Sequence, residues 1–320
     1  MADVAVIGGG ISGIACAKQL AERGITVDVF DRGHRLGGRL ACQTLRDTGT
    51  AWDGRVVDVG ASYFTASDPQ FRAVVDDWVH RGVAQEWTDT FHVGAGDGSL
   101  APKAGTMRYS AQRGMRSLVE DLADQLPEDR VTLHHPVDVE RIEVLDDAVA
   151  VNGVRYEAAA LCGPDPQMST LMSREPQPPV LWEPAMALTA VYDERYWGDL
   201  DGVFVNDDPV LTFVADDGRR RGDNAPVLVA HSGPVLAALH LAEPTGAAPA
   251  MLASLTRVMD IPPPAWFSVK RWTFARPASG RPQPCAIDGR VGWAGDAWAG
   301  GPRTQSAWVS GTTLGRALLD

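Results

Sequence analysis

The first forty residues hold the feature that most constrains the fold, a glycine-rich turn between an apolar run and a helical pattern. Residues 4–7 (VAVI) are continuously apolar, as in a buried parallel strand. Residues 8–13 (GGGISG) follow as a turn, and apolar residues then recur at helical spacing until Gly24. A second apolar run, residues 25–30, ends at Asp31. This order predicts a βαβ unit at the start of a parallel sheet.

The glycines of this unit fit the G-x-G-x-x-G pattern of dinucleotide-binding folds. Gly8 permits the tight turn, Gly10 lets the backbone approach a pyrophosphate, and Gly13 lets helix and strand pack closely. The N-terminus of the helix then offers free N–H groups to the phosphates. Asp31 can accept both hydrogen bonds of a ribose diol and disfavours a 2′-phosphate. We therefore expect an adenine dinucleotide without that phosphate.

Two further glycine-rich segments stand at opposite ends of the chain. Residues 33–39 (GHRLGGR) follow just after Asp31. Their glycines let a ligand approach the backbone closely, and Arg39 supplies a cation for a phosphate or flavin oxygen. Residues 291–296 (VGWAGD) form an apolar run that ends in Gly-Asp, and a helix is expected from about residue 304 to 319. Together these segments indicate one large ligand that contacts the backbone of segments near both ends of the sequence.

On these three motifs the chain resembles the flavin-dependent amine oxidase superfamily, whose second glycine motif has the form GGR. The resemblance favours FAD over NAD. It implies that Asp296 holds a ribityl hydroxyl and that the helix starting at Thr304 faces the N1–C2=O edge of the flavin. A helix N-terminus stabilises the negative charge of reduced flavin there.

Within that superfamily the chain is similar to the renalase-like branch. Residues 58–66 (DVGASYFTA) carry the most specific match, and weaker matches follow at 113–118, 163–167, 227–232 and 271–277. Three segments depart from the pattern. Asp31 replaces glutamate, residues 304–307 (TQSA) replace an acidic motif, and the arginines at 219–221 lie in a variable loop that we interpret as a solvated hairpin tip.

The resemblance implies oxidation of dihydronicotinamide isomers of NAD(P)H by hydride transfer to flavin N5, with O₂ as acceptor and H₂O₂ as product. It implies non-covalent FAD, because the C-terminal motif lacks a cysteine at the usual linking position. The residues assigned to the cofactor are Gly8, Gly10, Ile11, Ser12, Gly13, Asp31, Arg32, Gly37, Gly38, Arg39, Gly60, Ala61, Ser62, Val139, Gly295, Asp296, Thr304 and Gln305.

Three residues are candidates for the catalytic face by their match to the same segments. Tyr63 is either at the substrate or in the core. His231 ends an apolar run and is either catalytic or a structurally hydrogen-bonded histidine. Trp272 either covers the flavin or packs the sheet. Hydride transfer needs little acid–base help, since positioning and electrostatics suffice.

Two other functions stay open. The first keeps the fold and changes the substrate to a small amine, although the inserted region offers only Lys270 as the lysine that many amine oxidases place near flavin N5. The second is a flavin-binding or electron-carrying protein without turnover. The oligomeric state stays open as well.

Length and pattern predict an α/β fold in which a discontinuous Rossmann-type FAD-binding domain carries an inserted α+β substrate domain built on an antiparallel sheet. We assign residues 1–62, 105–168 and 284–320 to the first and residues 63–104 and 169–283 to the second. Proline-rich turns separate β-type stretches between residues 165 and 283, which predicts the antiparallel insert.

Charge and cysteine spacing exclude several classes of protein. A formal net charge of −12 argues against nucleic-acid binding and against a polybasic membrane face. The four cysteines lack zinc-ligand spacing and predict neither a metal site nor a disulfide framework. No apolar stretch reaches the ~20 residues of a membrane span. We expect a cytoplasmic protein with a phosphate-bearing substrate near Arg108, Arg113 and Arg116.

Overall fold

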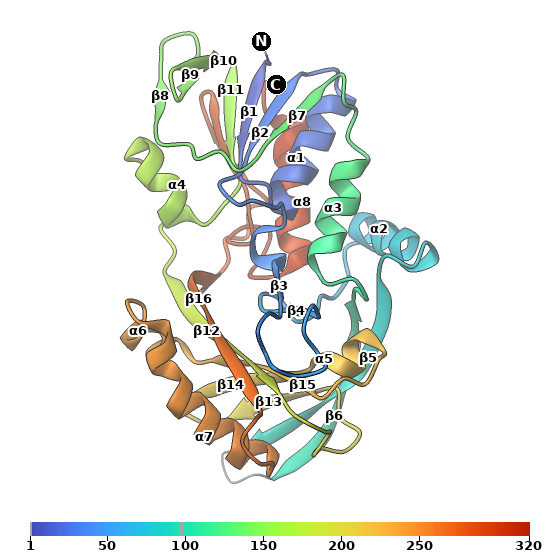
Figure 1. Cartoon of the computed structure of the whole chain (residues 1–320). Coiled ribbons are helices and arrows are strands. Elements are labelled where there is room, and N and C mark those ends of the chain that lie inside the picture. The colour runs from blue at the N-terminus through green and yellow to red at the C-terminus, as the bar shows by residue number, and fades with distance from the viewer. Residues whose placement is uncertain (1, 96–98) are drawn as a thin grey trace.

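The computed structural model of the chain describes residues 2–95 and 99–320 and shows two large sheets, one above the other (Figure 1). The upper sheet has the order β17-β18-β11-β1-β2-β7. Its strands are parallel except β17, which pairs antiparallel with β18. Their bounds are β1 Val4–Ile7, β2 Val27–Phe30, β7 Val131–His134, β11 Ala158–Leu161, β17 Ala286–Asp288 and β18 Val291–Trp293.

Helices from both chain ends cover one face of this sheet. In Figure 1, α1, α3 and α8 lie side by side to the right of it, and the N- and C-termini lie close together at its top. The other face packs against a small antiparallel sheet of β8, β9 and β10. The bounds are α1 Ile11–Glu22, α3 Arg116–Asp124, α8 Thr304–Ala317, β8 Ile142–Val144, β9 Val149–Val151 and β10 Val154–Tyr156.

The lower sheet has seven strands in the order β16-β12-β15-β14-β13-β5-β6. Every pairing in it is antiparallel except that of β13 with β5. The bounds are β5 Gln85–Ala95, β6 Leu100–Ser110, β12 Trp182–Val191, β13 Gly202–Asn206, β14 Leu211–Asp216, β15 Val227–Ser232 and β16 Trp266–Pro277.

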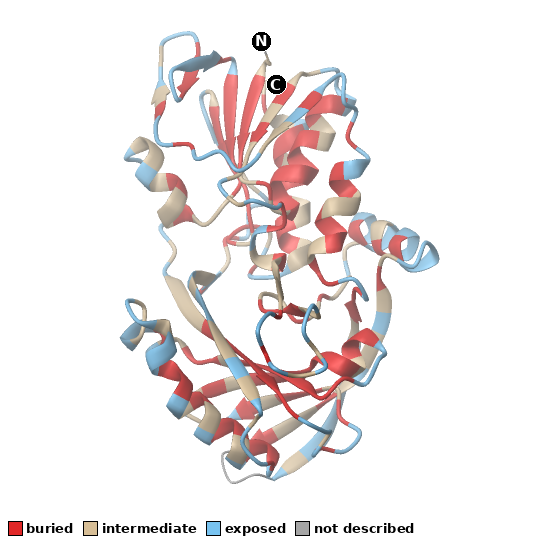
Figure 2. Ribbon diagram, viewed as in Figure 1, coloured by how far each residue is buried: buried red, intermediate tan, exposed pale blue. Residues whose placement is uncertain are grey.

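The remaining elements cover the lower sheet and join the two layers. Helices α6 and α7 lie on its outer face, and the ribbon of β3 and β4 lies between the two sheets (Figure 1). Figure 2 shows buried residues concentrated in the upper sheet, in the facing sides of α1 and α8, and in the centre of the lower sheet. The bounds are α2 Pro69–His80, β3 Cys42–Thr44, β4 Val56–Asp58, α4 Asp165–Met172, α5 Asp217–Arg221, α6 Pro234–Leu239 and α7 Ala248–Met259, with 3₁₀ turns at Gly38–Leu40 and Pro244–Ala247.

The predicted fold class is confirmed, because a parallel Rossmann-type sheet and a separate, mostly antiparallel sheet are both present. Two of the predicted domain boundaries fall inside elements, at 104/105 within β6 and at 168/169 within α4. The glycine-rich turn expected over residues 93–98 lies partly outside the described residues. Within the described part of the chain, no helix is long and apolar enough to cross a membrane.

One prediction about the surface is wrong. Residues 219–221 were expected at a solvated hairpin tip, yet Arg220 is completely buried and Arg221 is 9% exposed. They belong to the short helix α5, which sits against the segment that follows β4. Three adjacent cations look like a solvated surface, but here buried carboxylates neutralise two of them.

Candidate functional site

A cavity of about 1900 Å³ lies between the two sheets. Its lining comes from the carboxyl ends of β1 and β2, from the N-termini of α1 and α8, and from strands of the lower sheet. Pockets for single drug-sized ligands hold roughly 300–1,000 Å³. The cavity therefore has room for a dinucleotide together with a second molecule.

The first glycine turn forms one end of the cavity. Gly8 has φ +113°, and a Cβ there would lie 2.6 Å from the carbonyl oxygen of Cys162. Gly10 faces Gly38 of the second glycine motif across the cavity, so that a Cβ on Gly10 would lie 4.0 Å from the Cα of Gly38. Side chains larger than glycine would narrow this passage between two backbones, which matches the close approach that a pyrophosphate requires.

Asp31 is held at the end of β2 by two backbone groups. One carboxylate oxygen accepts the N–H of Gly9 at 2.6 Å, and the other accepts the N–H of Gly33 at 2.7 Å. Each carboxylate oxygen has a further lone pair, so the side chain can still accept the hydrogen bonds of a ribose diol. The two glycine motifs thus fix the acid in the place that the sequence pattern predicts.

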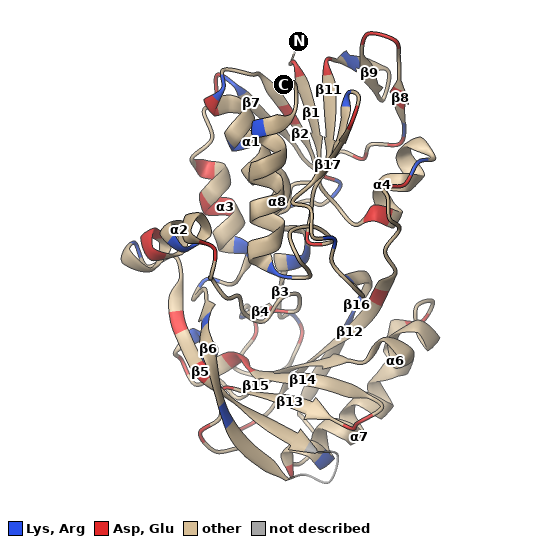
Figure 3. Ribbon diagram, turned by 180° about the vertical axis from the view of Figure 1, so that it is seen from behind, with Lys and Arg blue, Asp and Glu red and all other residues tan. Residues whose placement is uncertain are grey.

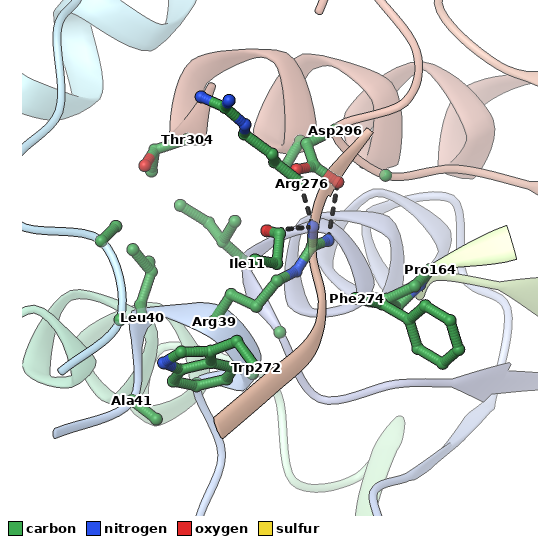
Figure 4. Close-up of a pocket in the computed structure, with 18 of the residues that line it drawn as sticks. Ile11, Arg39, Leu40, Ala41, Pro164, Trp272, Phe274, Arg276, Asp296 and Thr304 are labelled. Atoms are coloured by element: carbon green, nitrogen blue, oxygen red, sulfur yellow. Dashed lines mark hydrogen bonds and ion pairs between the residues drawn. The ribbon is translucent and has the colours of Figure 1, made fainter. Parts of the chain in front are cut away.

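Arg39 and Asp296 join the two chain ends inside the cavity (Figure 4). The guanidinium donates to both carboxylate oxygens, with Nη2–Oδ1 at 2.6 Å and Nη1–Oδ2 at 2.8 Å. Such a bidentate pair fixes both side chains in one geometry. Its members were predicted separately, Arg39 for phosphate or flavin oxygen and Asp296 for a ribityl hydroxyl.

The N-terminus of α8 also opens on the cavity. Its N-cap residue, Arg303, makes no side-chain capping hydrogen bond, and Thr304 lines the cavity. Figure 4 shows Thr304 beside Arg276 at the beginning of this helix. The first-turn N–H groups and the helix dipole therefore favour an electron-rich group at this point.

Buried polar atoms without protein partners support the fit to FAD. Three atoms of residues that line the cavity, Ser12 Oγ, Ser62 Oγ and Arg116 Nε, are buried and have no hydrogen-bond partner among residues 2–95 and 99–320. Unpaired buried polar groups are costly, so their position around one cavity indicates a ligand that satisfies them. With the two glycine turns and Asp31, the donor set suits a dinucleotide whose phosphates lie near α1.

Most of the residues predicted for the cofactor line this cavity. They are Gly8, Gly10, Ile11, Ser12, Asp31, Arg32, Gly37, Gly38, Arg39, Gly60, Ala61, Ser62, Val139, Gly295, Asp296 and Thr304. Gly13 does not line it; a Cβ there would lie 1.8 Å from the carbonyl oxygen of Gly8, so this glycine serves helix packing. Gln305 does not line it either. Its amide oxygen accepts the backbone N–H groups of Ser67 and Asp68 at 2.6 and 2.9 Å.

Replacing Gln305 with alanine should therefore affect stability more than cofactor binding. The substitution removes the acceptor of two backbone N–H groups at the start of α2, which we expect to lower the free energy of unfolding by about 1–2 kcal/mol. The dissociation constant for FAD should stay within a factor of about 2. Thermal melts and flavin titration of the same preparation measure both quantities. A large loss of FAD affinity with unchanged stability would contradict this expectation and would show that Gln305 contacts the cofactor.

The three predicted catalytic residues also line the cavity. Tyr63 packs against Phe213 with the two rings tilted and their centroids 5.9 Å apart, and Phe213 lies 6.4 Å from the ring of His231. Trp272 Nε1 donates to the carbonyl oxygen of Val59 at 2.7 Å. The structure thus brings the three side chains to one wall, which we call the substrate wall (Tyr63, Phe213, His231 and Trp272).

Burial sets the protonation state of two of these groups. It lowers the pKa of His231 to about 4, with a further contribution from the positive charge of Arg220, so the imidazole is neutral at physiological pH. Burial raises the pKa of the Tyr63 hydroxyl above its usual value, although Arg108 opposes this rise. The substrate wall is therefore uncharged near neutral pH.

Several residues of the site carry no local sequence signal. Phe204 and Phe213 line the cavity from the lower sheet, and their alternation in apolar strands does not distinguish them from core residues.

Of the three arginines expected at a substrate phosphate, only Arg116 lines the cavity. Arg108 stacks on Phe91 at 4.0 Å, and Arg113 is exposed. Cations from other segments line it instead, at Arg32, Arg35, Arg72, Lys270, Arg271, Arg276 and Arg303. Figure 3 shows the acidic residues spread over both layers.

The ribose contact predicts that Asp31→Ala weakens FAD binding. The substitution removes a charged acceptor from the ribose and leaves the N–H groups of Gly9 and Gly33 unpaired. Loss of hydrogen bonds to a charged group corresponds to roughly a 10- to 100-fold rise in the dissociation constant. Quenching of FAD fluorescence on titration into apoprotein measures it. Asp146→Ala, in an exposed loop, is the control and should bind FAD as the wild type does.

Comparison with known proteins shows two levels of similarity. Residues 6–78 match the family described as the NAD(P)-binding Rossmann-like domain. Chloroplastic/mitochondrial protoporphyrinogen oxidase 2 of Arabidopsis thaliana is 38% identical over 74 residues, which are 23% of this chain and 13% of that protein. Flavin-containing amine oxidase A of Sus scrofa is 48% identical over 63 residues, 20% of this chain and 11% of that protein. These sequence matches span about an eighth of the relatives' length.

Solved structures match over nearly the whole chain. The putative protoporphyrinogen oxidase from Exiguobacterium sp. 255-15 has a TM-score of 0.75 at 13% identity, with 98% of each chain covered. Cyclohexylamine oxidase from Brevibacterium oxydans IH-35A has a TM-score of 0.75 at 15% identity, covering 99% of this chain and 98% of that one. Putrescine oxidase bound to putrescine has a TM-score of 0.68 at 15% identity, with 98% of each chain covered. The chain therefore shares the fold of these oxidases.

Proposed function

We propose that the chain is an oxidoreductase that binds FAD non-covalently and oxidises a small organic substrate with O₂ as the electron acceptor. One observation carries this proposal. The three motifs predicted for FAD, from both chain ends, meet in one cavity, and the uncharged substrate wall closes the same cavity from the lower sheet.

Bound FAD would supply the redox chemistry, accepting a hydride from the substrate and passing the electrons to O₂ to give H₂O₂. The chain itself supplies binding and orientation. The glycine turns and Asp31 hold the dinucleotide, Arg39 and Asp296 lie where the two chain ends meet, and α8 directs its N-terminus into the cavity. The substrate wall excludes water and offers flat apolar faces to the second molecule.

Two substrate classes are candidates. The fold comparisons favour a small amine, because the names of two matched structures include putrescine and cyclohexylamine. Lys270 lines the cavity and is available for such chemistry. The segment 58–66 and its renalase-like pattern favour a dihydronicotinamide. Several cavity cations, among them Arg303, have no carboxylate partner among the described residues and suit the phosphates of such a dinucleotide.

The decisive experiment begins with the purified protein. A yellow preparation whose flavin passes into the supernatant on acid precipitation supports non-covalent FAD, and a colourless protein that takes up no FAD contradicts the proposal. Anaerobic bleaching of the flavin is then compared for putrescine, cyclohexylamine, fresh NADH and aged NADH. Bleaching by amines favours the first class, and bleaching by aged NADH alone favours the second. H₂O₂ release on admitting air tests the acceptor. A flavin that none of these reduces supports a protein without turnover.

A further inference from the structure

The last arginine of the second glycine motif is engaged by the protein itself. Arg39 donates to both carboxylate oxygens of Asp296, at 2.6 and 2.8 Å (Figure 4). It also donates to the carbonyl oxygen of Ala275 on β16 at 3.3 Å, and its guanidinium lies 5.1 Å from the ring centroid of Trp182 on β12. The bidentate pair of Arg39 with Asp296 is neutral as a unit. The cation that this motif was expected to offer to a phosphate is therefore already neutralised.

Two other arginines near this motif act on the cavity only through water. Arg35 pairs with Glu120 of α3 at 2.6 Å, and its side chain is 58% exposed. Arg32 directly follows the ribose acid Asp31 and is exposed as well. Solvent screens an exposed charge and weakens its interaction with a ligand. A cation that neutralises the phosphates of a dinucleotide strongly must lie deeper in the cavity.

Arg116 meets this requirement. It is the first residue of α3, it lines the cavity, and it is half-buried. Among residues 2–95 and 99–320, its buried Nε has no hydrogen-bond partner and its guanidinium has no carboxylate partner. A buried N–H group of a charged side chain is costly to leave unpaired. The side chain therefore indicates an acceptor, preferably an anion, inside the cavity.

The side chain of Arg116 lies against the second glycine motif. A Cβ on Gly37 would lie 3.1 Å from Arg116 Cγ and 3.5 Å from Arg116 Nε. Gly37 donates its backbone N–H to the carbonyl oxygen of Gly9 at 2.9 Å, which joins the two glycine motifs. The next residue, Gly38, faces Gly10 across the cavity. Arg116 is therefore beside the passage where the pyrophosphate of a dinucleotide is expected to approach the backbone.

A hydroxyl from a neighbouring helix adds to this donor set. Ser12 lies in the first turn of α1, which packs against α3. Its Oγ lines the cavity and, within the described part of the chain, is buried without a hydrogen-bond partner. A guanidinium, a hydroxyl and the first-turn N–H groups of a helix are groups that bind phosphate. The substrate wall is instead built mainly on β14, β15 and β16 of the lower sheet, so this donor set serves the cofactor.

We propose that Arg116 binds the pyrophosphate of the dinucleotide, and that Arg39 is instead a positioning residue that holds Asp296 and β16 in one geometry. The proposal rests on the proposed function for the identity of the ligand, a dinucleotide. The planar guanidinium of Arg116 offers two parallel N–H groups to a phosphate. Glycine at position 37 leaves room for its aliphatic stem. The phosphates thus meet a cation that lies outside all three FAD motifs.

The test uses ADP, which carries the phosphates but neither the ribityl chain nor the flavin. Calorimetric titration of the full-length apoprotein gives the dissociation constant for ADP, and quenching of flavin fluorescence gives that for FAD. Arg116→Gln removes the charge, and we expect both constants to rise roughly 10- to 100-fold. Arg39→Gln should bind ADP as the wild type does. It should bind FAD several-fold more weakly, because Asp296 loses its fixed orientation.

Three further variants complete the test. Arg113→Gln makes the same change on a neighbouring arginine that is exposed and does not line the cavity, and it should leave both constants unchanged. Arg116→Lys keeps the charge without the planar fork and should recover part of the ADP affinity. If Arg116→Gln does not fold, Arg116→Met keeps the stem beside Gly37, and the same losses are expected. Added salt should weaken ADP binding more in the wild type than in Arg116→Gln, since salt screens the charge that the variant lacks.

Three results would overturn the proposal. The first is an unchanged ADP affinity in folded Arg116→Gln, even if a substrate then reduces the flavin more slowly, because Arg116 would then serve the substrate. The second is an equal loss of ADP affinity in Arg39→Gln, which would show that Arg39 binds the phosphates itself. The third is a wild-type protein that binds no ADP. A wild type that binds ADP but no FAD contradicts only the proposed function, and the ADP titration still decides the role of Arg116.

Discussion

Replacing Asp217 with alanine should produce a large loss of stability. The side chain is completely buried and is shared by Arg55, Arg220 and Arg221. Without it, Arg220 and Arg221 retain only Asp58, and Arg55 retains only the half-exposed Asp223. Removing one partner of a buried ion pair costs about 3–5 kcal/mol. Differential scanning calorimetry should show a fall in melting temperature of about 10 °C. Asp76→Ala, whose ion pair with Arg72 is exposed, should change stability by less than about 1 kcal/mol.

The same residue gives the stability a defined pH dependence. Burial alone would raise the pKa of Asp217, but Arg220, Arg221 and Arg55 outweigh it and hold the pKa well below the usual range. Because the folded pKa is lower than the unfolded one, the stabilisation is complete above pH ~4 and is lost as the pH falls further. The difference in melting temperature between wild type and Asp217→Ala should therefore shrink between pH 5 and pH 3. A constant difference over that interval would show that the charge of Asp217 is not what stabilises the fold.

The sequence predicted the cofactor half of the site because its signals are local. Gly8, Gly10 and Asp31 act within one βαβ unit, and the reason for each lies within a few residues of it. Arg39 and Asp296 were also recognised separately by their motifs. Their direct pairing was not predicted, since 257 residues separate them and only the fold brings them together.

The other half of the site depends on contacts between distant segments. Arg220 and Arg221 resemble a surface loop in sequence because one of their two anionic partners, Asp58, lies about 160 residues away and only the fold brings it to them. Gln305 was assigned to the cofactor because its motif opens a helix, whereas its side chain turns toward the start of α2. Periodicity also cannot tell an aromatic residue that lines a cavity, such as Phe213, from one in the core.

Gly311→Ala is the second substitution with a large expected effect. Gly311 and Gly315 lie one turn apart on α8 and face α1, where a Cβ would lie 1.9 Å from the carbonyl oxygen of Ser12 and 2.5 Å from that of Cys16. Both obstacles are backbone atoms, so the helices must move apart. Overpacking of this kind costs about 1–3 kcal/mol, occasionally more, and we expect Gly311→Ala to fall at the upper end.

Separation of these helices should also weaken FAD binding, although Gly311 itself does not line the cavity. The N-termini of α1 and α8 both open on the cavity, through Ser12 and Thr304, so their spacing sets the spacing of two cofactor contacts. We expect the dissociation constant for FAD to rise tenfold or more, which is about 1.4 kcal/mol. Excess FAD should recover part of the lost melting temperature, because a ligand that binds only the folded state stabilises it by mass action.

Gly198→Ala is the matched control for this prediction. Gly198 is exposed, has no positive φ, and has no atom within 4 Å of the position of an added Cβ. Its substitution should change the free energy of unfolding by no more than about 0.5 kcal/mol and leave FAD affinity unaltered. If Gly311→Ala lowers stability without weakening FAD, the two helix N-termini do not act together on the cofactor. FAD binding would then depend on the glycine turns and Asp31 alone. The contact between α1 and α8 would serve the packing of the fold rather than the binding of the cofactor.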